Sequence, residues 1–127
     1  MNRETIFTKN APRAVGPYSQ AVKVGGWIYL SGQLPIDPHT NEIIQGPIEE
    51  QTELIMKNAQ QVLEAAGASI KNVVKVTLFI ANMDEFGKIN DIYSNFFPSD
   101  PPARSAVQVA RLPKDVGIEV DIIAYVE

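Results

Sequence analysis

Few side chains in this sequence are suited to catalysis. The chain has no cysteine, which excludes a disulfide framework, thiolate zinc or iron–sulfur sites, and a thiol nucleophile. Its single histidine, His39, lies in the polar, turn-rich run 37–41, where we expect a solvated loop side chain. A metal site or a Ser-His-Asp triad therefore has almost no support, and any chemistry must use other groups.

Length and charge narrow the possible functions further. At 127 residues the chain can bury one core, so we expect residues 1–127 to form a single domain. The 11 basic and 15 acidic residues give a formal charge of −4, which argues against nucleic acid as a partner. The start of the chain is interrupted by charge and no long apolar run follows, so we expect a cytoplasmic protein without a signal peptide or a membrane span.

The first half of the chain predicts a hairpin and a helix. Two short strand-like runs, 19–24 and 27–31, are joined by Gly25 and Gly26, which tolerate the positive φ of a tight hairpin turn. In 49–66, apolar residues recur at intervals of three and four, as expected for an amphipathic helix with one buried face.

The second half predicts a strand, a helix and another hairpin. The β-branched run 72–81 indicates a central strand, and Asp84 is expected to cap a helix that Pro98 ends. Two long strands, 103–112 and 118–126, are expected to pair through the turn between them. The expected fold is an α+β two-layer domain, with two helices on one face of a mixed sheet.

Side chains alternate between the two faces of a strand, so each expected strand can be divided into an inner and an outer set. The residues assigned to the core are Val74, Val76, Leu78, Ile80, Val107, Val109, Ile118, Val120, Ile122, Ala124 and Val126. Those assigned to the opposite face are Lys75, Thr77, Phe79, Arg104, Ala106, Gln108, Glu119, Asp121, Ile123 and Tyr125. This second face is too apolar for free exposure, so we expect a subunit interface; a half-exposed sheet is the alternative.

Arg104 and Glu119 are both assigned to this second face. In a simple hairpin of the last two strands, Glu119 falls opposite Ala110, about 20 Å along the strand from Arg104. The two side chains could not then share a site within one chain. If they cooperate, one comes from a neighbouring subunit, or the register differs from this simple one.

Several ordered motifs resemble those of the RidA (YjgF-type) reactive-intermediate deaminases. The resemblance is carried most clearly by Pro102-Ala103-Arg104-Ser105 and by the residues around Glu119. The matching stretches are 16–21, 30–35, 64–69, 90–93, 102–105, 110–115 and 118–120. The similarity therefore extends over nearly the whole chain.

The resemblance implies a fold, an assembly and an activity. The fold would be the chorismate-mutase-like α+β fold, assembled as a homotrimer with ligand sites in the clefts between subunits. The activity would be hydrolysis of 2-iminobutanoate and 2-iminopropanoate, which form from enamines released by pyridoxal-phosphate enzymes. The products would be 2-oxo acids and ammonia.

The resemblance also implies two catalytic residues. Arg104 would hold the substrate carboxylate, because a guanidinium fork can bind it bidentately and a lysine cannot. Glu119 would orient a water molecule and accept its proton. A protonated imine is already a strong electrophile, so neither a covalent nucleophile, a metal nor a cofactor is expected.

The implied substrate-binding residues are Tyr18, Ser31, Gly32, Asn90 and Arg104. Tyr18 would wall the pocket and offer its hydroxyl, while the Ser31-Gly32 backbone would approach the ligand closely. One position departs from the family pattern: Ala106 replaces a cysteine present in many relatives. Thiol-dependent side functions are therefore not expected, whereas imine hydrolysis is.

Two other functions are compatible with the sequence. The first is a non-catalytic trimer that binds 2-oxo acids or related small carboxylates through the same clefts. The second is an RNA-cleaving translation inhibitor, a role attached to some relatives. The acidic net charge counts against the second function.

Overall fold

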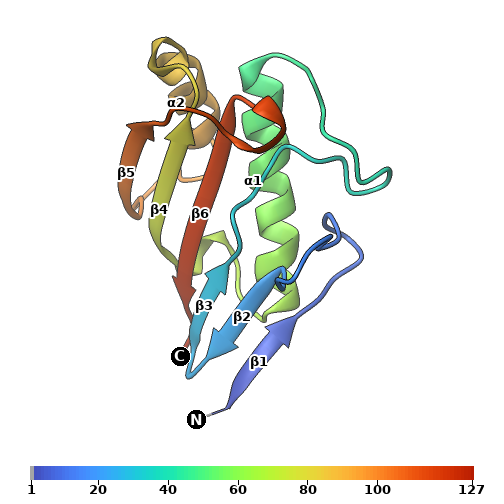
Figure 1. The fold of residues 1–127 in the computed structure, drawn as a ribbon. Helices are drawn as coiled ribbons and strands as arrows, with labels where there is room; N and C mark the ends of the chain where they lie inside the picture. Colours follow the sequence, from blue (N-terminus) through green and yellow to red (C-terminus); the bar gives the residue numbers. More distant parts are fainter. Residues whose placement is uncertain (1) are drawn as a thin grey trace.

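Two helices cover one face of a six-stranded mixed sheet in the computed structural model, which describes residues 2–127 (Figure 1). The elements are β1 (Arg3–Ile6), β2 (Ala21–Val24), β3 (Trp27–Leu30), α1 (Ile48–Ala65), β4 (Val73–Ile80), α2 (Phe86–Ser94), β5 (Ala103–Gln108) and β6 (Ile118–Tyr125). The sheet order is β1-β2-β3-β6-β4-β5, and β4 and β5 run parallel. The expected α+β two-layer class is confirmed.

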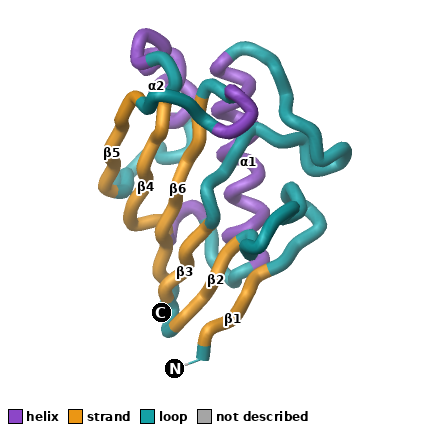
Figure 2. The backbone as a smooth tube through the Cα atoms, in the orientation of Figure 1, coloured by secondary structure: helices purple, strands orange, loops and turns teal. Residues whose placement is uncertain are grey.

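The chain topology explains why both helices lie on one face. β3 and β4 are each antiparallel to β6, so they are parallel to each other, and α1 connects them as a crossover. α2 connects the parallel pair β4 and β5 and moves across the sheet in the same direction. Right-handed crossovers in one direction place their helices on the same side, as Figure 2 shows. No α-helix of the described residues covers the opposite face (Figure 2).

The core lies between α1 and the middle of the sheet. The helix presents the buried stripe at three- and four-residue spacing that the sequence predicts: Ile55, Ala59, Val62, Leu63 and Ala66. Met56, beside this stripe, is also fully buried. Alternate residues of β6 meet these side chains, namely Ile118, Val120, Ile122 and Ala124. Neither helix of residues 2–127 is long and apolar enough to cross a membrane.

The β2–β3 hairpin forms as predicted. Gly25 has φ 55° and Gly26 has φ 90°, so both turn residues adopt the left-handed region that favours glycine. β1 pairs antiparallel with β2, and this strand was not predicted. Its sequence, Arg-Glu-Thr-Ile, has one apolar residue and gives no alternating signal.

Substitution of two glycines should change stability in opposite directions. At Gly26 an added Cβ would collide with the backbone oxygen of Val126, and its φ is positive, so Gly26→Ala should lower the free energy of unfolding by about 2 kcal/mol. At Gly87, inside α2, an added Cβ meets nothing, so Gly87→Ala should raise it by about 0.5–1 kcal/mol. Urea titration of the two variants measures both changes in the free energy of unfolding. Equal effects of the two substitutions would contradict the difference between the crowded, positive-φ position of Gly26 and the open helical position of Gly87.

The predicted hairpin of the last two strands is wrong. β5 is delivered by α2 to the outer edge of β4, while β6 pairs with the inner edge of β4. The connection between them crosses the end of β4, where Val109 N–H donates to the Ile80 carbonyl and Ala81 N–H donates to the Gly117 carbonyl, both at 3.0 Å. The few residues between the two strands indicated a local hairpin turn. The crossover through α2 instead places β5 on the far side of β4 from β6, so the two strands do not pair.

The predicted faces of β5 are also wrong. Arg104, Ala106 and Gln108 pair with Val76, Leu78 and Ile80, which are fully buried on the helix face. Ala106 accordingly packs against the core, whereas Val107 is 43% exposed on the opposite face. On an edge strand, an apolar residue such as Val107 does not identify the inner side, because the helices cover that strand incompletely.

Two smaller predictions need correction. A bulge between Val73 and Lys75 puts Val73 in the core and leaves Val74 exposed, although alternation assigned Val74 to the core. Asp84 does not cap the second helix. Its backbone N–H donates to the side chain of Asn82 at 3.0 Å, which caps a short 3₁₀ turn, Met83–Glu85, that leads into α2.

Candidate functional site

Arg104 lies at the edge of the sheet, against α2. Its Nη1 donates to Oδ1 of Asn90 at 2.7 Å, and its Cζ lies 4.8 Å from the ring centroid of Tyr93 and 5.3 Å from that of Phe86. Neither of the two ion pairs within residues 2–127, Lys57–Glu53 and Arg111–Asp115, involves this guanidinium. The positive charge is therefore held by neutral groups only and remains available to an anion.

The Arg104 guanidinium opens onto a pocket of about 410 Å³. Its lining residues are Asn90, Tyr93, Ser94, Phe97, Pro101, Pro102 and Arg104. The two predicted residues Arg104 and Asn90 are thus brought together, and Asn90 contacts the guanidinium directly. A guanidinium with free N–H donors beside a pocket can hold a planar carboxylate.

Glu119 lies on the opposite face of the sheet, beside Gly32. An added Cβ at Gly32 would overlap the Glu119 carboxylate and would also contact Oδ1 of Asp121. The two carboxylates therefore converge on this glycine. Burial, and then the negative charge of Asp121, raise the pKa of Glu119, and burial raises the pKa of Asp121. A carboxylate with a raised pKa is a stronger base, which suits proton abstraction near neutral pH.

Tyr18 and Ser31 lie near Gly32. All three line a narrow pocket of about 50 Å³ that also contains Gln20. The Ser31 hydroxyl donates to the Ser19 carbonyl at 2.6 Å, and Tyr18 is half exposed, with its hydroxyl accepting from Val15 N–H at 3.4 Å. These contacts fix the loop that follows β3 and leave much of the tyrosine ring open.

The predicted residues thus form two groups that do not meet within one chain. One contains Arg104 and Asn90, and the other contains Tyr18, Ser31, Gly32 and Glu119. Arg104 is opposite Val76 and Glu119 is opposite Phe79, on β4 between them. The separation is about 10 Å across two strand spacings and about 10 Å along three residues, and the side chains point to opposite faces. The register does differ from the simple hairpin, and in the observed register the two side chains again do not meet within one chain.

Gly32→Ala tests the role of this close approach. The added methyl group must displace the Glu119 carboxylate. We therefore expect the rate of the imine hydrolysis that the family resemblance implies to fall about 10²-fold, with a small change in the free energy of unfolding. Gly46→Ala is the matched control, because its Cβ would likewise displace a carboxylate, that of Glu50, away from the site. Steady-state kinetics of both variants give the comparison; equal losses would show that Glu119 is not the group affected.

Sequence reasoning missed three residues around these groups. Asp121 was assigned to the face of Glu119, and its position two residues along the same strand was a usable signal. Tyr93 and Phe86 lie seven residues apart in the second predicted helix, which is the spacing of an apolar stripe and by itself indicates only core packing. Their contact with Arg104 depends on the crossover that brings β5 beside α2, and no local pattern encodes it.

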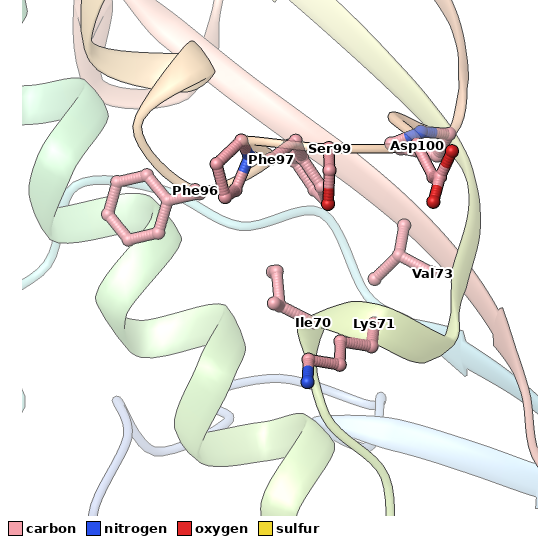
Figure 3. A pocket seen from close by; sticks show the side chains of 9 residues that line it. Ile70, Lys71, Val73, Phe96, Phe97, Ser99 and Asp100 are labelled. Carbon is pink, nitrogen blue, oxygen red and sulfur yellow. The ribbon is translucent and has the colours of Figure 1, made fainter.

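A third pocket, of about 580 Å³, lies between the end of α2 and the turn before β4 (Figure 3). Its walls are mainly apolar and include Ile70, Val73, Phe96 and Phe97, with Lys71 and Asp100 at separate sides. None of the predicted catalytic or binding residues lines it.

The sheet face without helices carries large apolar side chains. Trp27 and Tyr29 are 43% and 46% exposed, and the Trp27 ring packs edge-on against Tyr125 with 4.9 Å between centroids. Register places Ile123 and Phe79 on the same face. The apolar second face is therefore confirmed, with Val107, Trp27 and Tyr29 as members in place of Arg104 and Ala106.

Comparison with known proteins gives the family. The model of the family described as Endoribonuclease L-PSP matches residues 8–126. A RutC family protein from Pyrococcus abyssi is 53% identical over the full length of both chains. A protein from Dermatophagoides farinae named 2-iminobutanoate/2-iminopropanoate deaminase is 46% identical over 98% of each chain. The chain belongs to this family, the RidA (YjgF-type) proteins that its motifs resemble.

Solved structures agree with this assignment. Escherichia coli TdcF, solved with bound serine, superposes with a TM-score of 0.93 at 41% identity and covers 98% of this chain and 99% of its own. The YjgF gene product of E. coli gives the same TM-score at 42% identity, with 98% and 99% covered.

Proposed function

We propose that this chain hydrolyses 2-imino acids to 2-oxo acids and ammonia, at a site formed between neighbouring subunits of a homotrimer. The observation that carries the proposal is the Arg104 guanidinium, which neutral groups hold beside an open pocket and which forms no ion pair with an acidic residue of the described part of the chain. Relatives at 42–46% identity named as imine or reactive-intermediate deaminases support the reaction. The serine-bound TdcF structure supports a small ligand that carries a carboxylate.

In the proposed reaction, Arg104 binds the carboxylate of the protonated imine through its free N–H donors. Glu119 from the adjacent subunit accepts a proton from water as the water oxygen bonds to the C=N carbon. Glu119 returns this proton to the nitrogen of the resulting carbinolamine, the C–N bond breaks, and ammonia leaves. The hydroxyl proton passes to the Glu119 carboxylate and then to solvent as the oxygen becomes a carbonyl, so one protonated imine and one water give one 2-oxo acid, one ammonia and one proton.

The trimer is part of the proposal. Arg104 and Glu119 face opposite sides of one sheet, so a shared site needs two chains. The face that carries Trp27, Tyr29 and Tyr125 provides an apolar surface of the kind that subunit interfaces bury.

The test is loss of the enamine and imine formed from threonine by a threonine dehydratase, followed by absorbance. Wild-type protein should accelerate that loss, and Arg104→Ala should not. No acceleration by the wild type, or equal acceleration by the variant, would contradict the proposal. Saturable binding of 2-oxobutanoate without turnover would instead identify a carboxylate-binding protein.

Ribonuclease activity is named in the description of the matched family. The chain has a formal charge of −4 and one histidine, His39, which is exposed in the loop before α1. These features do not favour RNA as the substrate. A salt-dependent affinity for RNA, followed by cleavage, would be the result that supports it.

A further inference from the structure

The environment of Arg104 raises a question about how its side chain is oriented. Arg104 is exposed on an edge strand, and a free arginine side chain loses about 2 kcal/mol of rotamer entropy when fixed. Within residues 2–127, the one hydrogen bond of this guanidinium is the one that it donates to Oδ1 of Asn90, at 2.7 Å. A single neutral hydrogen bond leaves rotation about that contact possible, so other groups must define the plane of the guanidinium.

Two aromatic rings of α2 provide such a surface. Cζ of Arg104 lies over Tyr93 at 4.8 Å and over Phe86 at 5.3 Å. Tyr93 is 4% exposed, and its ring packs against Phe97 with 4.9 Å between centroids. Burial and this contact hold the Tyr93 ring in place. Attraction between a cation and a ring face restrains the guanidinium without neutralising its charge, whereas a carboxylate partner would compete with an anionic ligand.

We propose that Tyr93 and Phe86 are positioning residues that hold the Arg104 guanidinium in the plane required to bind a carboxylate. The relevance of this role to catalysis rests on the proposed function; the positioning itself does not. The faces of the two rings hold the guanidinium, and the Tyr93 hydroxyl does not contribute to this positioning. That hydroxyl is buried and has no hydrogen-bond partner within residues 2–127.

The chain offers a matched pair of variants. Phe86 and Phe96 are both half-buried phenylalanines packed against the core, but only Phe86 lies under Arg104. Phe86→Leu should raise the KM for the imine and the Kd for 2-oxobutanoate about tenfold, in the range of a partly desolvated cation–ring contact, with a smaller change in kcat. Phe96→Leu should leave all three values within twofold of the wild type.

Tyr93 separates the ring from the hydroxyl. Tyr93→Phe keeps the ring and should therefore raise KM and Kd far less than Tyr93→Leu does, with a higher melting temperature because an unpaired buried hydroxyl is removed. Tyr93→Leu should raise KM and Kd about tenfold. If Tyr93→Leu does not fold, Phe86→Leu still decides the proposal.

A readout independent of turnover is the NMR signal of the Arg104 side chain. Protons held over ring faces are shifted upfield, and this shift should shrink in Phe86→Leu and Tyr93→Leu but persist in Tyr93→Phe and Phe96→Leu. Unchanged shifts in both leucine variants would overturn the proposal, even if the wild type proved inactive. Equal losses of binding in Phe86→Leu and Phe96→Leu, or loss in Tyr93→Phe equal to that in Tyr93→Leu, would also overturn it.

Discussion

Mixed assemblies of two inactive variants, Arg104→Ala and Glu119→Gln, should regain about one quarter of the wild-type activity. Each site of the proposed trimer takes Arg104 from one chain and Glu119 from its neighbour. Random assembly of equal amounts gives both natural residues to about one site in four. The physical basis is the sheet itself, which directs the two side chains to opposite faces, with β4 between their strands.

Refolding or co-expression of the two variants, with native mass spectrometry to establish that mixed assemblies form, makes this measurable. The control replaces Glu119→Gln by a chain that carries both substitutions, because no complete site can then assemble. Recovery of activity in the first mixture alone supports a shared site. If mixed trimers form and stay inactive, the two residues do not act together across an interface.

Glu119→Gln should abolish turnover while leaving ligand binding intact. Removal of a general base lowers kcat by about 10²–10⁴-fold, while Arg104, on the other face, still binds the carboxylate. The measurement is kcat from the dehydratase-coupled assay together with the Kd for 2-oxobutanoate. A variant that loses binding and turnover equally would show that Glu119 contributes to binding and does not act as the base.

The pH dependence tests the same assignment. Glu119 must be ionised to accept a proton, so the rate should rise with pH through its pKa, which burial and Asp121 raise. Asp121→Asn removes the negative charge that contributes to this raised pKa. It should therefore move the acidic limb of the pH–rate profile to lower pH. The limb should keep its position in Asn90→Ala, because Asn90 contacts Arg104 and not Glu119. A limb that Asp121→Asn leaves in place would exclude Glu119 as its source.

The raised pKa of Glu119 also predicts how stability depends on pH. A raised pKa in the folded state means that folding favours the protonated carboxyl, so this contribution to stability is fully present below the unfolded pKa of Glu119. It is lost as pH rises through the folded pKa. The melting temperature of Glu119→Gln should therefore exceed that of the wild type at neutral pH, and the difference should vanish in acid.

Local patterns predicted the elements that depend on a few neighbouring residues. The stripe of α1, the Gly25–Gly26 turn and the alternation of β6 are periodic or conformational properties of short segments. β1 was missed because Arg-Glu-Thr-Ile has no such property and pairs only because β2 offers it an edge. Val74 was misassigned because a bulge shifts the alternation without leaving a signal in the sequence.

The sequence by itself determined the fold class, the family and the residue types for the proposed chemistry, because these follow from composition, periodicity and ordered motifs. Only the tertiary structure decided which strand lies beside which. The crossover through α2 placed β5 parallel to β4 and turned Arg104 toward Asn90, Tyr93 and Phe86, away from Glu119. Strand order is set by packing between segments distant in the chain, and therefore the division of the predicted residues into two groups could not be predicted from local sequence.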